Sequence, residues 1–228
     1  MPGAIMRTHF YKTIQGWFDY ADLYSAAIEL APANQPTHFV EIGSWLGRSA
    51  AFMAVEIANS GKNIRFDCVD SWEGTGLPGE YDAQNDTVKK GLFDQFIENM
   101  KPVERFYQVE RGMSHEVASR YAFKSLDFVF FDAGHSYEAV DNDLRAWLPR
   151  MKDGGIIAGH DFFTSPDGVG KAVKQHVDKF HTVGSSWYAR VEGKSTKDIE
   201  QLLAAYHRAN ETRFQRMKRA LRHWRRGY

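Results

Sequence analysis

The sequence is poor in cysteine, in long apolar runs and in net charge, and each shortage excludes a class of protein. Cys68 is the single cysteine among 228 residues, which excludes a disulfide framework and favours a small buried side chain. No apolar run is long enough to predict a transmembrane helix. The opening residues, MPGAIMRTHFYK, lack the apolar core of a signal peptide, so we expect a cytoplasmic protein without a membrane span.

The formal net charge is zero, but the charge is unevenly distributed. Residues 213–226 (RFQRMKRALRHWRR) contain seven Arg and Lys and no acid, so the rest of the chain carries a formal charge of minus seven. Such a segment predicts either a contact with an anionic partner or a solvated helical tail. Met217, Leu221 and Trp224 recur in it at roughly helical spacing, which leaves a homo-oligomer joined through this segment as a third alternative.

Strand and helix patterns alternate about five times along the chain. Apolar runs predict strands at 38–42, 64–69, 105–110, 126–131 and 155–159, and helices at 49–58, 87–100, 116–121, 137–148 and 168–180. One or two further strands are expected within 182–191, and the residues 72–85, rich in Gly and acid, predict a loop or lid. The alternation predicts a doubly wound α/β sheet with right-handed crossovers.

We expect one domain over residues 1–228. It would comprise an N-terminal helix at 10–31, a catalytic core at 38–192 and a basic C-terminal helix at 195–228. The N-terminal helix carries many aromatic side chains, among them Tyr20 and Tyr24, which either flank a site or pack against the sheet.

Two of the predicted strands end on polar side chains. The run 126–131 is followed by Asp132, and the run 155–159 is followed by His160 and Asp161. Ligands bind at the carboxyl edge of an open α/β sheet, and neighbouring strands lie roughly 5 Å apart. If the two strands are neighbours, these three side chains would reach one cation.

The first strand and its loop read FVEIGSWLGRSA. Gly43 would allow a ligand to approach the backbone, and the helix that begins at Ser49 favours a carboxylate or a phosphate. The spacing after Glu41, E-x-G-x-x-x-G, differs from the G-x-G-x-x-G of pyrophosphate binders and suits a ligand with an ammonium and a carboxylate. Asp70 ends the next strand, where an acid either binds both hydroxyls of a ribose or serves as a turn residue. Ser114 follows the third strand and either meets an adenine edge or caps a short helix.

These segments together resemble a class I S-adenosylmethionine-dependent methyltransferase. More narrowly, the chain is similar to the metal-dependent O-methyltransferases of the macrocin O-methyltransferase and cephalosporin-hydroxylase-like group. The resemblance covers about residues 15–165 and rests on FVEIGSWLGRSA, VDSWEG at 69–74, FFDAGHSYEAVDNDL at 130–144 and GGIIAGHDF. It implies a mostly parallel, seven-stranded, Rossmann-like sheet flanked by helices.

The resemblance also implies a cofactor and a metal site. S-adenosylmethionine would be bound by a set of seven residues: Glu41, Gly43, Ser44, Ser49, Asp70, Ser114 and Asp132. A divalent metal ion would be bound by Asp132, His160 and Asp161, where relatives place an acid or an Asp-Asn pair at the position of His160-Asp161. This difference leaves magnesium, which the family favours, beside manganese or a later divalent ion. His135 would act with Asp132 in catalysis as the general base, unless it is a structural turn residue.

The expected reaction is the methylation of a hydroxyl of a small molecule, such as a sugar, a glycosylated metabolite or a catechol-like diol. Two alternatives belong to other classes. One is a nucleic-acid methyltransferase that uses residues 213–226 to contact phosphates. The chain lacks an N-P-P-Y-like signature of base methylation, so a nucleic-acid partner is not expected. The other is a non-catalytic nucleotide-binding module.

Overall fold

The computed structural model describes residues 6–74 and 86–226. The chain divides into two compact units, Met1–Lys194 and Ser195–Tyr228. The first unit contains the sheet, and the second contains the helix α7 (Lys197–Arg226). Most of the loop expected at 72–85 lies outside the described residues. Among the helices that are described, none is both long and apolar enough to cross a membrane.

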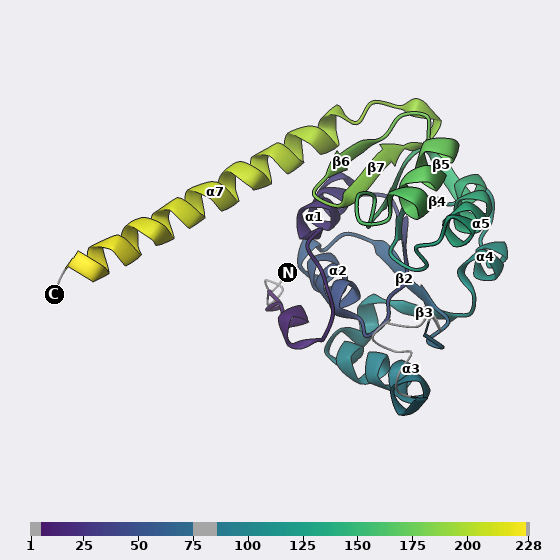
Figure 1. Ribbon diagram of the computed structural model, residues 1–228, viewed down its shortest axis with the longest axis horizontal. Coiled ribbons are helices and arrows are strands. Elements are labelled where there is room, and N and C mark those ends of the chain that lie inside the picture. The colour runs from purple at the N-terminus through teal and green to yellow at the C-terminus, as the bar shows by residue number, and fades with distance from the viewer. Residues whose placement is uncertain (1–5, 75–85, 227–228) are drawn as a thin grey trace. The chain divides into compact units, whose positions relative to one another are not determined.

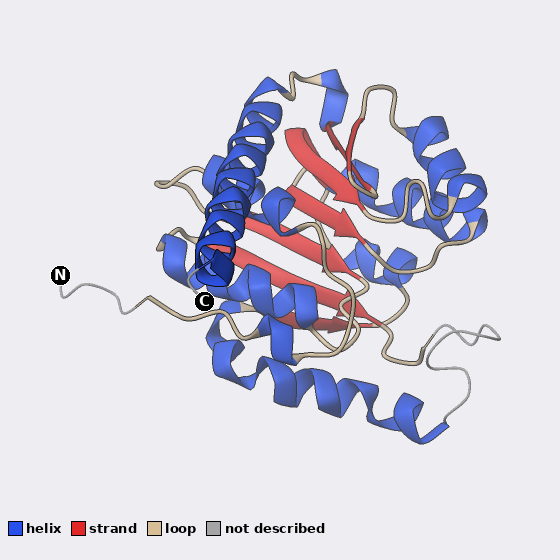
Figure 2. Cartoon of the chain, turned by 60° about the vertical axis from the view of Figure 1, so that its left-hand side comes forward, coloured by secondary structure: helices blue, strands red, loops and turns tan. Residues whose placement is uncertain are grey.

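A seven-stranded sheet forms the centre of the first unit, in the order β3-β2-β1-β4-β5-β7-β6 (Figures 1 and 2). Its strands are β1 (Thr37–Ile42), β2 (Ile64–Asp70), β3 (Gln108–Arg111), β4 (Leu126–Phe131), β5 (Met151–Gly159), β6 (His181–Val183) and β7 (Ser186–Arg190). The first five strands are parallel, and β7 and β6 add an antiparallel edge. The predicted doubly wound, mostly parallel sheet is therefore confirmed.

Helices cover both faces of this sheet (Figure 2). They are α1 (Ala21–Leu30), α2 (Arg48–Ser60), α3 (Asp86–Met100), α4 (Ser114–Val117), α5 (Tyr137–Trp147) and α6 (Lys171–His176). The alternation of side chains along β4 shows which helix lies on which face. Phe128 and Phe130 contact Tyr24 of α1, whereas Val129 and Phe131 belong to the core cluster that includes Leu144 of α5.

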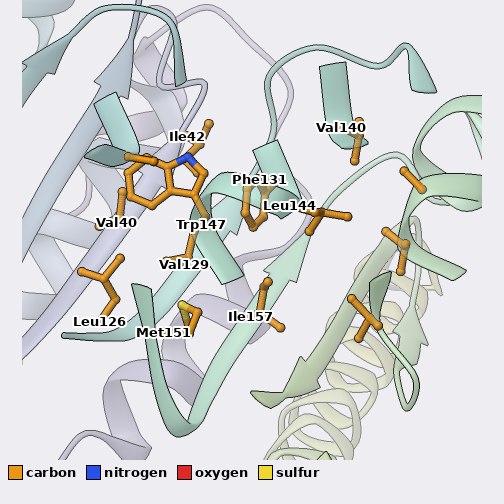
Figure 3. Close-up of a cluster of buried hydrophobic side chains, with 14 of the residues drawn as sticks. Val40, Ile42, Leu126, Val129, Phe131, Val140, Leu144, Trp147, Met151 and Ile157 are labelled. Atoms are coloured by element: carbon orange, nitrogen blue, oxygen red, sulfur yellow. The ribbon is translucent and has the colours of Figure 1, made fainter. Parts of the chain in front are cut away.

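The cluster on the α5 face joins β1, β4 and β5 to the helix (Figure 3). Trp147 is fully buried there, beside Tyr121 at 4.9 Å between ring centroids. Because both faces of β4 are covered by helices, the strand reads as a nearly continuous apolar run, as parallel strands do. The packing of both faces fixes the carboxyl ends of β1, β4 and β5.

The strand expected at 155–159 already begins at Met151, and the helix expected at 116–121 is the short α4 followed by a 3-10 turn, Ala118–Arg120. Three further elements differ more from the sequence-based expectations. The N-terminal helix expected at 10–31 is a 3-10 turn, Tyr11–Thr13, followed by an irregular segment and by α1. Gly16 lies in that segment with φ +137°, and a Cβ atom there would approach the ring of Trp45 to 3.2 Å. The strand expected at 105–110 begins only at Gln108, because a 3-10 helix with Pro102 near its start occupies Lys101–Phe106. The helix expected at 168–180 is a π-helix, Pro166–Gly170, followed by the short α6.

The strand order places a topological switch point between β1 and β4. The chain runs outward from β1 through β2 to β3, and then returns to continue on the other side of β1 with β4 and β5. Ligands of doubly wound sheets bind outside the carboxyl ends of the strands at such a point. The residues that follow β1, β4 and β5 therefore form the candidate site.

Candidate functional site

Asp132, His160 and Asp161 meet at the carboxyl edge because β4 and β5 are neighbours with Phe131 opposite Gly159. The Nδ1 atom of His160 lies 3.2 Å from Oδ2 of Asp161 and 3.9 Å from Oδ1 of Asp132. The structure thus brings together the three side chains that the sequence analysis assigned to a metal ion.

His135 reaches the same cluster from the turn between β4 and α5. Its Nε2 atom lies 3.0 Å from Oδ2 of Asp161, and one ligand atom each from Asp132, His135 and Asp161 lie within 4.8 Å of one another. One imidazole nitrogen and two carboxylate oxygens suit a divalent cation. The turn is fixed by its neighbours, because Ser165 Oγ donates to the His135 carbonyl at 2.9 Å and a Cβ atom on Gly168 would collide with that carbonyl.

The charges of this cluster shift its pKa values in opposite directions. Burial lowers the pKa of His160, but the hydrogen bond with Asp161 and the charges of Asp132, Asp161 and Asp19 outweigh it and raise that pKa to about 9. Burial acts to raise the pKa of Asp161, yet hydrogen bonds from His135 and His160 hold it well below its usual range. The pKa of Asp132 is raised, chiefly by burial. Asp161 is therefore ionised at neutral pH, as a metal ligand must be, whereas His160 is protonated and would release its proton on binding a cation.

Backbone conformations of high energy gather at this edge. Asp161 has φ +59°, Trp45 after β1 has φ +43°, and Trp72 after β2 has φ +52°. Left-handed conformations of residues other than glycine cost about 1–3 kcal/mol each and are concentrated at functional sites. Their surroundings must therefore hold them in place.

Asp70 holds two of these residues. Its Oδ2 accepts a hydrogen bond from the Trp45 backbone N–H at 2.8 Å, and its Oδ1 accepts one from the Trp72 backbone N–H at 2.7 Å. The Trp72 indole N–H donates in turn to the Trp45 carbonyl at 2.7 Å. Asp70 thus fastens the loop after β1 to the end of β2. A carboxylate has about four acceptor positions, so ribose hydroxyls would share these oxygens with the backbone.

Glu41 at the end of β1 is a buried acid with one oxygen engaged. Its Oε2 accepts a hydrogen bond from the Tyr24 hydroxyl at 2.6 Å. Its Oε1 and the nearby Ser44 Oγ are buried and have no hydrogen-bond partner among the residues that the structure describes. Burial raises the pKa of Glu41 to about 7, although the hydroxyls of Tyr24, Ser44 and Ser49 act to lower it. Buried polar atoms without a well-formed hydrogen bond are rare in proteins, so Glu41 Oε1 and Ser44 Oγ are candidates for contact with a ligand.

The glycines of the loop after β1 are needed for packing. Gly43 has φ +91°, and a Cβ atom on it would collide with the Asp132 carbonyl at the end of β4. The close approach of the Asp132 carbonyl therefore requires a glycine at position 43, in addition to the room that a ligand would need. Ser49 is buried in the first turn of α2, which Gly47 precedes with φ +88°.

Ser114 faces α5. Its Oγ accepts a hydrogen bond from the Trp147 indole N–H at 2.9 Å. The residue that caps α4 is Met113, which contributes no side-chain hydrogen bond, so the interpretation of Ser114 as the helix cap is wrong. The Ser114 hydroxyl also lowers the pKa of Asp143, which burial raises to about 6.

Sequence reasoning did not assign polar roles to Asp19, Tyr20 and Tyr24. The Tyr20 hydroxyl donates to Oδ2 of Asp132 at 2.8 Å, and Asp19 Oδ1 lies 2.9 Å from Nε2 of His160. Burial, followed by the neighbouring carboxylates, raises the pKa of both tyrosines well above the usual value. The spacing of Tyr20 and Tyr24 places the two residues one helical turn apart, but it does not specify the partners of their hydroxyls.

Comparisons with known proteins agree with this fold. The family model described as "Methyltransferase domain" matches residues 40–162. The structure of the O-methyltransferase NovP is similar with a TM-score of 0.58 and 17% identity, over 74% of this chain and 77% of that one. The O-methyltransferase from Bacillus cereus in complex with SAH is similar with a TM-score of 0.53 and 15% identity, over 82% of this chain and 84% of that one.

A relative in sequence is the uncharacterized protein y4gI of Sinorhizobium fredii (strain NBRC 101917 / NGR234). It is 21% identical over 166 residues, which make up 73% of this chain. The match spans 17% of the length of that relative. The family match includes the ends of β1, β2, β4 and β5, and it extends over more than half of the chain. The chain therefore belongs to the methyltransferase domain family, and its fold is that of O-methyltransferases of known structure.

Proposed function

We propose that the chain transfers a methyl group from S-adenosylmethionine to a hydroxyl of a small molecule with the help of a divalent cation. The observation that carries the proposal is the meeting of Asp132, His160 and Asp161 beside the loop after β1 at the switch point. NovP and the Bacillus cereus protein, both O-methyltransferases of similar fold, support oxygen as the acceptor atom, and the bound SAH of the latter supports the cofactor.

The cofactor fits the unpaired polar atoms of the loop after β1. Glu41 Oε1 would accept a hydrogen bond from the ammonium of the methionine part, and Ser44 Oγ would donate one to its carboxylate. Gly43 and Ser49 shape the same loop, and Asp70 at the end of β2 remains the proposed ribose ligand. Ser114 and Asp132 complete the proposed set. S-adenosylmethionine supplies the methyl group as an electrophilic carbon on sulfur.

The cation fits the cluster at the ends of β4 and β5. His160 presents Nδ1 to Asp132 and Asp161, while its Nε2 is hydrogen-bonded to Asp19. Histidines that ligate metals usually donate their second ring N–H to a carboxylate in this way. A bound divalent cation supplies a Lewis acid that lowers the pKa of the acceptor hydroxyl. Two carboxylates and an imidazole admit magnesium, manganese or a later divalent ion.

His135 is the proposed general base. It is half exposed, so its imidazole can exchange protons with solvent, and its Nε2 lies 3.0 Å from Oδ2 of Asp161 at the cluster. The ring nitrogen that carries no proton would accept the proton of the acceptor hydroxyl. Its position within reach of Asp132 and Asp161 also makes it the rival of His160 as the metal ligand. An acceptor with two adjacent oxygens, such as a sugar or a catechol, matches a site in which a cation and a base lie side by side.

The test is binding and turnover with and without a chelator. We expect calorimetry to show binding of S-adenosylhomocysteine in EDTA, because Glu41, Ser44 and Asp70 lie on other strand ends than the proposed ligands. Methyl transfer to a catechol or a sugar diol should stop in EDTA and return with Mg²⁺ or Mn²⁺. Full activity in excess chelator would exclude the cation, and no binding of S-adenosylhomocysteine in any condition would contradict the proposed cofactor.

A further inference from the structure

Tyr20, which precedes α1 as its N-cap residue, and Tyr24 within the helix both lie on the side of α1 that packs on β4. Tyr20 caps the helix and Tyr24 follows four residues later, with 5.2 Å between their ring centroids. Both rings contact Phe130 of β4, at 4.3 Å for Tyr20 in a stacked arrangement and at 5.0 Å for Tyr24 in a T-shaped one. Their side chains are 5% and 0% exposed, so packing fixes both rings.

Each tyrosine donates its hydroxyl to one acid of the site. Tyr20 donates to Oδ2 of Asp132 at 2.8 Å, and Tyr24 donates to Oε2 of Glu41 at 2.6 Å. Side chains alternate between the two faces of a sheet, and Glu41 of β1 lies opposite Phe130 of β4. Glu41 and Asp132 therefore lie on the face that Phe130 shares with α1. Hydrogen bonds to a charged acceptor are stronger than those between neutral groups, so each bond orients its carboxylate.

The consequence is that each acid keeps one oxygen for a ligand. Asp132 presents Oδ1, which lies 3.9 Å from His160 Nδ1 at the proposed cation site. Glu41 presents Oε1, which is buried without a partner among the described residues. One tyrosine therefore acts on the cation side of the site and the other on the cofactor side. Both lie outside residues 40–162, where the family model matches.

We propose that α1 is part of the site and not only a cover for the sheet: Tyr20 is the positioning residue of Asp132, and Tyr24 is the positioning residue of Glu41. The inference rests on the proposed function, in which Asp132 belongs to both the cofactor set and the cation set. Because Oδ1 of Asp132 faces His160, the inference assigns that oxygen to the cation and Oε1 of Glu41 to the cofactor. The two tyrosines make similar hydrogen bonds, but each one would affect the binding of a different ligand. An experiment that measures the two affinities separately can therefore test the proposal.

The experiment compares Tyr20→Phe and Tyr24→Phe in the full chain, each of which deletes a hydroxyl and keeps the ring. Titration calorimetry with Mn²⁺ alone measures the cation site, and titration with S-adenosylhomocysteine in EDTA measures the cofactor site. We expect Tyr20→Phe to weaken Mn²⁺ binding by about tenfold with cofactor affinity within about twofold, and Tyr24→Phe to do the reverse, as the loss of a hydrogen bond to a charged group predicts.

Tyr121→Phe is the matched control. Tyr121 is also buried and donates its hydroxyl to a buried acid, Oδ2 of Asp67, at 3.0 Å, away from the site. This variant should lower the melting temperature and change neither affinity. If Tyr20→Phe and Tyr24→Phe also lower only the melting temperature, or weaken both ligands equally, the positioning roles are wrong. If the wild-type chain binds neither Mn²⁺ nor S-adenosylhomocysteine, the proposed function fails first.

Discussion

Oδ2 of Asp161 lies between two imidazoles, those of His135 and His160. Their surroundings indicate which of them is the proposed metal ligand and which is the proposed general base. His135 approaches it with Nε2 at 3.0 Å and His160 with Nδ1 at 3.2 Å. The two histidines differ in what lies behind them. His160 is 14% exposed and hydrogen-bonded to Asp19, whereas His135 is 47% exposed. A buried, carboxylate-backed imidazole suits a ligand, and an exposed one suits a group that exchanges protons with solvent.

We therefore expect His160→Ala and His135→Ala to fail in different ways. His160→Ala should weaken Mn²⁺ binding by at least tenfold, because a ligand atom is lost. His135→Ala should retain Mn²⁺ affinity within about twofold and slow turnover by about 10²- to 10⁴-fold, the usual contribution of a positioned base. Calorimetry with Mn²⁺ and initial rates at saturating metal measure both quantities.

His176→Ala controls for the loss of any histidine that is paired with an acid. His176 Nε2 lies 2.6 Å from Oδ1 of Asp141, on α6 and α5, and neither residue belongs to the site. Its loss should leave metal affinity and rate unchanged. If His135→Ala loses the metal while His160→Ala retains it, the two assignments are exchanged and His135 is the ligand.

At the scale of elements, α5 contains an acid that works against stability. Asp143 is 7% exposed, and burial raises its pKa to about 6 while the Ser114 hydroxyl and His115 act to lower it. An unfolded Asp titrates near 3.9, so the folded chain binds this proton more tightly than the unfolded chain. The contribution of Asp143 to folding stability must then fall as the pH rises from about 4 to about 6, and the penalty persists above pH 6.

Asp143→Asn should therefore stabilise the chain at pH 7.5 by about 1–3 kcal/mol and have little effect near pH 4, because the amide keeps the shape and carries no charge. Thermal melts at the two pH values measure the difference, which amounts to a few degrees for a chain of this size.

The control is Asp153→Asn. The pKa of Asp153 is lowered by a hydrogen bond from Lys124, so its loss should give no gain at pH 7.5. A fall in the melting temperature of Asp143→Asn at both pH values would mean that α5 needs a carboxylate at this position.

The sequence predicted elements best where both faces of a strand are buried. The run 126–131 was bounded correctly because β4 lies between α1 and α5 and contains no residue that breaks the pattern. Asp132 and Asp161 were found for the same reason, since they follow the two strands that end beside each other. Local pattern therefore fixed both the strands and the acids at their ends.

Pattern reasoning failed where a tertiary contact overrides the local signal. Aromatic residues at 10–20 have helical spacing, but Gly16 passes close to the ring of Trp45, so the segment is irregular. Asp70 remains the proposed ribose ligand, but its bonds to Trp45 and Trp72 were not predicted, because they require the fold of two loops. The polar contacts of Tyr20 and Tyr24 likewise depend on where α1 packs, which their own spacing does not specify.

At the scale of the whole molecule, the chemistry and the basic segment belong to different units. Every residue proposed for the cofactor, the cation or the base lies within Met1–Lys194, whereas residues 213–226 lie within Ser195–Tyr228. The helix α7 is 30 residues long, and its last part carries seven Arg and Lys without an acid. Like charges three and four residues apart destabilise a helix, so this part of α7 needs support from outside its own turns.

We propose that the support is a second copy of this chain. Met217, Leu221 and Trp224 recur at intervals of four and three residues, a helical spacing suited to packing on another surface. The remainder of the chain carries a formal charge of minus seven, which complements the basic segment.

Truncation after Asn210 should accordingly lower the melting temperature of the protein or the number of subunits in its oligomer. Thermal melts measure the first quantity, and light scattering after size exclusion measures the second. The affinity for S-adenosylhomocysteine should stay within about twofold. A chain truncated only after Arg226 serves as the control, since it keeps the whole of α7. If the protein truncated after Asn210 folds and binds S-adenosylhomocysteine normally but no longer methylates a small diol, residues 213–226 belong to the active site, and the assignment of all the chemistry to the first unit is wrong.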